Sequence, residues 1–259
     1  MNQHRYDFAQ TLIRSAATFV LSHCDDALTI AYKNNNPSDI VTNIDTATET
    51  YLIDAIHTAF PDDTFLTEEK TTANIVSQDL WIIDPIDGTM NFAHMGVDYA
   101  ISLAFYQNGI PVFGLVYDIT RDELFHGYAG KTAYLNQTPL HAKTTALSDS
   151  IIDISLSSIQ IMQQHGYDFS QVEHHTLSQR NLGSAALRIC HVALGRVDIY
   201  VSAYLKTWDY AAARLILELA GGELALPTLH NFPLNDTPTP VFAANSTALI
   251  DELRHCFKR

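Results

Sequence analysis

The sequence has few cysteines, no long apolar run and little positive charge. Its three cysteines, Cys24, Cys190 and Cys256, form no CxxC pair and no even disulfide set, which is typical of reduced thiols in a cytoplasmic protein. No apolar run approaches the roughly 20 residues that a membrane-spanning helix requires. The first ten residues lack the basic and then apolar layout of a secretory signal. We therefore expect a cytoplasmic protein with no membrane partner.

Basic residues are outnumbered by acidic ones. The chain has 15 Lys and Arg against 29 Asp and Glu, a formal net charge of −14. This imbalance argues against binding to nucleic-acid polymers and to anionic membranes, because both need a basic surface. The first hundred residues alone hold 15 acidic and 4 basic residues. The acidic residues there form either a solvated surface or a site.

The 259 residues, 47% of them hydrophobic, are enough for one large domain or two joined lobes. The hydrophobic spacing predicts α/β layers in an N-terminal lobe, residues 1–145, and a C-terminal lobe, residues 146–259, that share an interface. Asn108-Gly109 between two apolar runs predicts a β-hairpin. Expected helices lie at 3–23, 45–59, 158–164, 184–194, 209–220 and 246–257; expected strands lie at 64–67, 80–83, 100–107, 110–119, 150–155, 197–202, 223–226 and 241–244, with two short ones within 123–135.

The segment WIIDPIDGTMNF, residues 81–92, is the densest chemical feature. An apolar β run brings Asp84 to a strand end, and Pro85 predicts a turn there because proline cannot continue the hydrogen-bonded ladder. The turn can aim Asp84, Asp87 and the carbonyl of Ile86 into one small volume. These hard oxygen ligands suit magnesium rather than zinc. The alternative is a simple Asp-Pro turn in which Asp87-Gly88 caps a loop.

Other acidic residues occupy comparable positions. Glu68 and Glu69 follow a β run and so also lie at a strand end. Asp209 opens a helix after Trp208, and Asp45 opens an earlier helix. Helix capping alone is a sufficient explanation for both of these aspartates.

The ordered segments VTNID, TEE, WIIDPIDGTMNF, GSAA and WDYAAARLILELAGG, with VFAANS at 241–246, resemble the inositol monophosphatase family of magnesium-dependent phosphatases. The resemblance implies a five-layered αβαβα fold, a homodimer and a small phosphorylated substrate. It further implies direct attack of water on a phosphate monoester, with no serine, cysteine or histidine nucleophile.

The same resemblance implies a metal site. Glu68, Asp84 and the Ile86 carbonyl would hold one Mg²⁺. Asp84, Asp87 and Asp209 would hold a second, and a third, weaker ion would lie nearby. The bound divalent ions would convert a pocket that repels anions into one that attracts phosphate.

Further roles are implied for residues around this site. Thr89 and Glu68 would orient the attacking water, with Asp45 near their network, and Lys33 resembles a lysine of a mobile loop. The backbone at Gly88-Thr89 and at the Gly183-Ser184-Ala185 turn would contact phosphate. Arg180 matches an arginine near the substrate. Lys206 would approach a second phosphate or is a solvated lysine paired with an acid.

The sequence departs from the family pattern at positions that determine substrate specificity. Inositol-preferring members have a glutamate where this chain has Ser202, and Lys70 replaces a common serine. The substrate therefore stays open between inositol monophosphate, a sugar phosphate and a nucleotide 2′- or 3′-phosphate. A regulatory, protein-binding member of the same fold with little phosphatase activity is the alternative function.

Overall fold

The computed structural model describes residues 2–23, 28–33, 36–227, 229 and 231–259. Cys24, for which a reduced thiol is expected, lies outside the described residues. Cys190 is buried and Cys256 is partly buried, and both are free thiols. Among the described residues, no helix is both long enough and apolar enough to cross a membrane.

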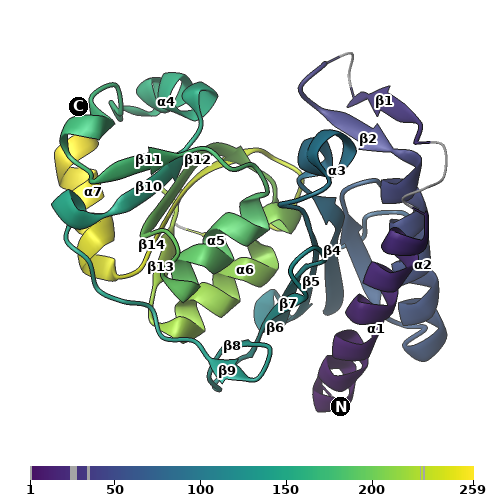
Figure 1. Ribbon diagram of the computed structural model, residues 1–259. Coiled ribbons are helices and arrows are strands. Elements are labelled where there is room, and N and C mark those ends of the chain that lie inside the picture. The colour runs from purple at the N-terminus through teal and green to yellow at the C-terminus, as the bar shows by residue number, and fades with distance from the viewer. Residues whose placement is uncertain (1, 24–27, 34–35, 228, 230) are drawn as a thin grey trace.

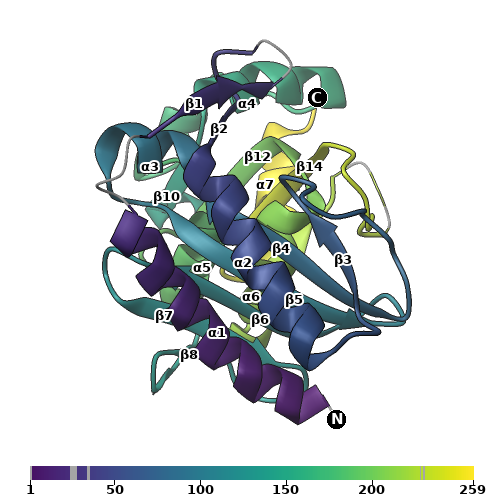
Figure 2. The same cartoon turned by 90° about the vertical axis from the view of Figure 1, so that its right-hand side faces the viewer.

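The elements stack in five layers, α, β, α, β and α, as expected (Figure 1). Helices α1 (Asn2–His23) and α2 (Asn43–Ala59) cover the outer face of a seven-stranded sheet, as Figure 2 also shows. Helices α5 (Ala185–Leu194) and α6 (Thr207–Ala220) lie between this sheet and a five-stranded sheet. Helix α7 (Thr247–Phe257) covers the far side of the second sheet.

The seven-stranded sheet has the order β3-β4-β5-β6-β7-β8-β9, in which β3 and β4 are parallel and all other neighbours are antiparallel. Asn108 and Gly109 have φ values of 52° and 75° in the turn between β5 and β6, which confirms the expected hairpin. The strands are β3 (Thr64–Thr67), β4 (Asp79–Asp87), β5 (Ala100–Gln107), β6 (Ile110–Asp118), β7 (Glu123–Tyr128), β8 (Tyr134–Leu135) and β9 (Thr138–Pro139).

Strand β4 does not end at Pro85, and the expected turn there is wrong. The strand continues to Asp87 through a register shift, with Asp84 opposite Ser102 and Asp87 opposite Ala100. Such a bulge places one extra residue on β4 and so tolerates a proline that lacks a ladder donor. The short helix α3 (Thr89–Met95) then begins after Gly88, and the sequence did not predict it.

The five-stranded sheet has the order β11-β10-β12-β14-β13. The expected strands are present, but the sequence did not predict β11 or the hairpin β1-β2, because three-residue strands carry too little alternation to be recognised. The bounds are β1 (Ile30–Tyr32), β2 (Ile40–Thr42), β10 (Ile151–Ile154), β11 (Ser178–Arg180), β12 (Ile199–Leu205), β13 (Glu223–Ala225) and β14 (Thr239–Ala244). The described residues also form α4 (Leu156–Met162) and short 3₁₀ turns at Leu147–Asp149, Gln163–His165 and Val172–His174.

Three buried clusters join the five layers. One packs α1 and α2 on the seven-stranded sheet, and another packs α7 on the five-stranded sheet. The third surrounds α5 and α6 and takes side chains from both sheets, including Ile82 and Val241. Burial of each large aliphatic side chain contributes about 1.5–3 kcal/mol. The middle helices therefore join both halves of the chain in one core.

Helix α6 approaches the seven-stranded sheet closely at Gly114 of β6. A Cβ atom at this position would lie 2.5 Å from the carbonyl oxygen of Ala212 and 2.8 Å from its Cα. These are backbone atoms of α6, so relief of the clash would move the helix. Because Asp209 lies in the first turn of α6, Gly114 also sets where its carboxylate lies.

We predict that Gly114→Ala lowers the free energy of unfolding by about 1–3 kcal/mol through overpacking. Gly127→Ala is the matched control: a Cβ there would clash with Leu219 Cδ1, at 2.7 Å, and that flexible side chain can rotate away, while Ala133 Cβ at 3.6 Å is an ordinary contact. Urea denaturation of the two variants checks this, and equal losses of stability in both would contradict the proposed role of the close approach.

Candidate metal centre

A cavity of about 310 Å³ opens where the ends of β3 and β4 meet α3, α5 and α6. Most of the residues singled out in the sequence come together here. The cavity is lined by Glu68, Asp84, Ile86, Asp87, Gly88, Thr89, Ser184, Ala185 and Asp209, among others.

Three carboxylates from distant parts of the chain converge in this cavity. Glu68 follows β3, Asp84 lies in β4 and Asp209 is in the first turn of α6, yet one oxygen from each lies within 4.8 Å of the other two. Carboxylate oxygens at this spacing suit a hard divalent cation such as Mg²⁺.

Burial and the charges of neighbouring acids make Asp84 and Asp209 resist ionisation. Burial first, and then the charges of Glu68, Asp87 and neighbouring acids, raise the pKa values of Asp84 and Asp209 well above their usual range. Burial also raises the pKa of Asp87 to about 6. A cation bound here would relieve this repulsion, so the residues present fit a divalent metal.

The N-terminus of α5 holds Asp87 in place. Its carboxylate accepts hydrogen bonds from the Ser184 hydroxyl, from the Ala185 N–H at 3.1 Å and from the Ala186 N–H at 2.8 Å. These bonds act against the rise in the pKa of Asp87. The Ala185 amide, expected to contact phosphate, is therefore engaged with a candidate metal ligand.

Thr89 links the cavity to a buried acid on α2. Its Oγ1 donates to Asp45 Oδ1 at 2.8 Å, and it lies 3.1 Å from the Ile86 carbonyl oxygen. Asp45 also accepts the Thr42 amide at 3.0 Å, which makes it the third residue of a capping box. Asp45 therefore both caps α2 and fixes the Thr89 hydroxyl. Burial raises the pKa of Asp45.

Lys33 lies against the acidic cluster. Its Nζ is 2.8 Å from Glu68 Oε1 and 2.6 Å from Glu69 Oε1. Burial, followed by the charge of Glu68, raises the pKa of Glu69 to about 7. The Lys33 ammonium thus supplies part of the positive charge that these acids require.

The sequence interpretation missed Glu49, a buried carboxylate on α2 that supports the Glu68 segment. It accepts hydrogen bonds from the amides of Glu69 and Thr71, both at 2.8 Å, and from the Thr67 hydroxyl at 3.0 Å. Its position four residues after Asp45 places both acids on one helix face, and this spacing is the signal that would have revealed it.

Three predicted substrate residues lie outside the cavity lining. Arg180 is exposed and its Nη1 donates to Ser178 Oγ at 2.6 Å. Lys206 lines a neighbouring cavity, with its Nζ 5.3 Å from the centre of the Trp208 ring, and Gly183 lines another. Lys70, an expected departure from the family pattern, pairs with Asp236 at the surface.

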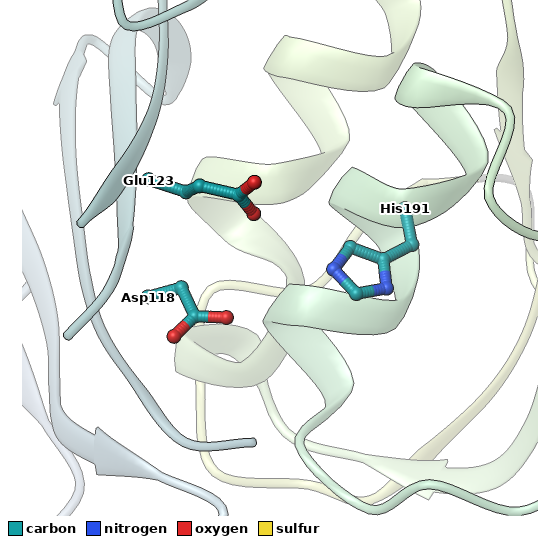
Figure 3. Close-up of side chains that lie close together, drawn as sticks. All are labelled: Asp118, Glu123 and His191. Atoms are coloured by element: carbon teal, nitrogen blue, oxygen red, sulfur yellow. The ribbon is translucent and has the colours of Figure 1, made fainter. Parts of the chain in front are cut away.

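A second cluster of potential ligands is an ion-pair network instead. Figure 3 shows Asp118 and Glu123 pointing toward His191 of α5. The Arg196 guanidinium forms a twofold ion pair with Glu123, and Asp118 pairs with Arg121 at 2.7 Å. Burial and nearby arginines lower the pKa of His191 to about 2, so that it is neutral. Because the carboxylates are already neutralised by arginines, this cluster does not suit a metal ion.

Comparison with known proteins gives a consistent family assignment. The family model described as "Inositol monophosphatase family" matches residues 1–256. The chain is 39% identical to the inositol-1-monophosphatase of Bacillus subtilis (strain 168), over 83% of each chain. It is 34% identical to the Nus factor SuhB of Escherichia coli (strain K12), over 90% of each chain.

The solved structures agree with this assignment. The crystal structure of inositol monophosphatase-II from Staphylococcus aureus MSSA476 superposes with a TM-score of 0.82 and 33% identity, covering 96% of this chain and 93% of that one. The chain therefore belongs to the inositol monophosphatase family and is a phosphoric monoester hydrolase.

Proposed function

We propose that this protein hydrolyses a small phosphate monoester with the help of Mg²⁺ held in the carboxylate cavity. The observation that carries the proposal is the convergence of Glu68, Asp84 and Asp209 within 4.8 Å. The raised pKa values of Asp84 and Asp209 support it, because the arrangement is unfavourable without a cation.

We assign the metal ligands as the family resemblance implies. Glu68, Asp84 and the Ile86 carbonyl would hold one Mg²⁺, and Asp84, Asp87 and Asp209 a second, with a third, weaker ion nearby. Bound Mg²⁺ would lower the pKa of water and stabilise negative charge on the phosphate oxygens. The hydrogen bonds from α5 would hold Asp87 in its coordinating orientation.

Protein side chains would position the attacking water. The Thr89 hydroxyl has one proton, and the nearby Asp45 carboxylate accepts it at 2.8 Å. The Thr89 oxygen can then accept a hydrogen bond from water, while Glu68 accepts the other proton of that water. This arrangement would direct a lone pair of the water toward phosphorus and contributes general-base assistance.

We assign phosphate contacts to the backbone at Gly88 and Thr89. The first turn of α3 has no side-chain cap, so its amides remain for an anion. Ser184 and Ala185 line the same cavity, and with Gly183 they complete the proposed phosphate-binding set; the Ala185 amide donates to Asp87 and would have to share its hydrogen with the phosphate.

The substrate is a small phosphate monoester resembling inositol monophosphate, a sugar phosphate or a nucleotide 2′- or 3′-phosphate. The similarity to an inositol-1-monophosphatase supports the first of these. Lys206, in a neighbouring cavity of about 590 Å³, would contact a second phosphate, and Arg180 would lie near the substrate, as the resemblance implies. The relatives named Nus factor SuhB are compatible with a regulatory role but do not favour it. A homodimer and a cytoplasmic location stay predictions.

We predict Mg²⁺-dependent phosphate release from at least one of inositol 1-phosphate, fructose 1,6-bisphosphate, NADP and 3′-phosphoadenosine 5′-phosphate. Asp209→Asn removes a charged ligand and should lower kcat at least about 10²-fold on the active substrate. Phosphate assays with Mg²⁺ and with chelator check both statements.

Asp54→Asn is the matched control, because Asp54 is an exposed aspartate on α2 away from the cavity. It should retain wild-type kcat. The proposal fails if no substrate is turned over with Mg²⁺, and the ligand assignment fails if Asp209→Asn keeps near-full activity.

We predict that stabilisation of the fold by Mg²⁺ increases as pH rises from 5 to 8. The folded-state pKa values of Asp84, Asp87 and Asp209 lie above the unfolded value of 3.8, so the metal-free folded state binds more protons than the unfolded state. Its stability therefore decreases as pH rises through these pKa values, about 6 for Asp87. Mg²⁺ counters this loss.

Urea denaturation at each pH, with saturating Mg²⁺ and with chelator, measures this difference. The contributions of groups distant from the cavity, such as His191, to the pH dependence of stability cancel in this difference, because these groups are present under both conditions. A Mg²⁺ effect that is constant or decreases with pH would contradict the charge assignment.

A further inference from the structure

A smaller cavity of about 190 Å³ adjoins the carboxylate cavity and shares Ala185 and Tyr204 with it. Polar side chains of Asp153, Ser158 and Ser202 line it, and its chemistry differs from that of the first cavity. Among the described residues that line it, Asp153 is the one carboxylate, and the resemblance assigns no role to Asp153.

Asp153 is the unusual group in this cavity. It lies on β10, it is only 2% exposed, and its Oδ2 has no hydrogen-bond partner among the described residues. A buried carboxylate oxygen without a partner is unfavourable, so it calls for a partner that the protein alone does not provide. Burial raises the pKa of Asp153 to about 6, although the charge of Arg188 and the backbone of Leu182 oppose the rise.

The sheet places Asp153 in the lining of the adjoining cavity. In the parallel pairs of the five-stranded sheet, Asp153 stands opposite Tyr200 of β12 and Arg180 of β11. Ser202 lies two residues beyond Tyr200 and therefore on the same face. A carboxylate acceptor, a hydroxyl and an arginine thus share one sheet face beside the carboxylate cavity.

We propose that Asp153 binds a hydroxyl group of the alcohol portion of the substrate and so selects polyhydroxylated phosphate monoesters. The inference rests on the proposed function, which places the phosphate in the neighbouring carboxylate cavity. The alcohol portion then extends toward the adjoining cavity. A carboxylate accepts a hydrogen bond from a hydroxyl and repels a second phosphate, so Asp153 favours a hydroxyl there.

Inositol 1-phosphate and cyclohexyl phosphate test this proposal, because they share a six-membered ring and differ in the ring hydroxyls. Asp153→Asn should raise the KM for inositol 1-phosphate about tenfold or more, with kcat little changed. It should leave both constants for cyclohexyl phosphate unchanged. The wild-type protein should itself show a KM at least about tenfold lower for inositol 1-phosphate, a comparison that needs no variant.

Asp149→Asn is the matched control, because Asp149 is an exposed aspartate of the same lobe, and it should behave as wild type. If Asp153 serves only as a counter-charge to the buried Arg188, Asp153→Asn lowers the melting temperature and affects both substrates equally, which would overturn the proposal. Equal wild-type KM values for the two compounds would also overturn it.

Failure of the proposed function gives a different result, since the wild type would then release phosphate from neither compound. Calorimetric binding of the same two compounds would decide the role of Asp153 in that case. Tighter binding of inositol 1-phosphate that is lost in Asp153→Asn supports the proposal, and equal binding of both compounds to both proteins contradicts it.

Discussion

Electrostatic repulsion between Glu68, Asp84 and Asp209 is the constraint around which the rest of the site is organised. Their oxygens are brought within 4.8 Å of one another in a cavity where Asp84 is buried and Glu68 and Asp209 are partly buried, although like charges in such surroundings repel strongly. Each candidate ligand is therefore held by further contacts. Glu49 anchors the segment of Glu68, and the Lys206 amide donates to Asp209 at 2.7 Å. The cavity is preorganised to bind a cation, and this arrangement lowers the stability of the fold when no cation is bound.

The ligands come from both halves of the chain, so the site exists only when the five layers are assembled. Glu68 follows β3 and Asp84 lies at the bulge within β4, both in the seven-stranded sheet, and Asp209 lies in the first turn of a helix that packs on that sheet from the C-terminal half. Gly114 permits this close packing. The division of the chain into two lobes near residue 145 remains a proposal. The helical layer packs against both sheets, so one hydrophobic core supports one site.

The sequence predicted features that depend on long periodic patterns or on dense motifs. The helix over 3–23, the Asn108-Gly109 hairpin and the convergence of Asp84 and Asp87 all belong to this group, whereas the place of Asp209 beside them was implied only by the family resemblance. The prediction failed at Pro85, because a bulge can absorb a proline that local propensity excludes from a strand. It also missed Glu49 and gave Asp153 no role, because the importance of each follows from burial and from partners far away in sequence.

Mg²⁺ titration by calorimetry near pH 7, repeated in two buffers of different ionisation enthalpy, measures whether protons leave as the metal binds. Asp84 and Asp209 have pKa values well above their usual range, so part of the metal-free population holds protons on this cluster. If these carboxylates form a cation site, they should therefore release protons when Mg²⁺ binds. Asp209→Asn should weaken the binding of Mg²⁺. Mg²⁺ binding with no proton release, or no binding at all, would contradict this interpretation of the site.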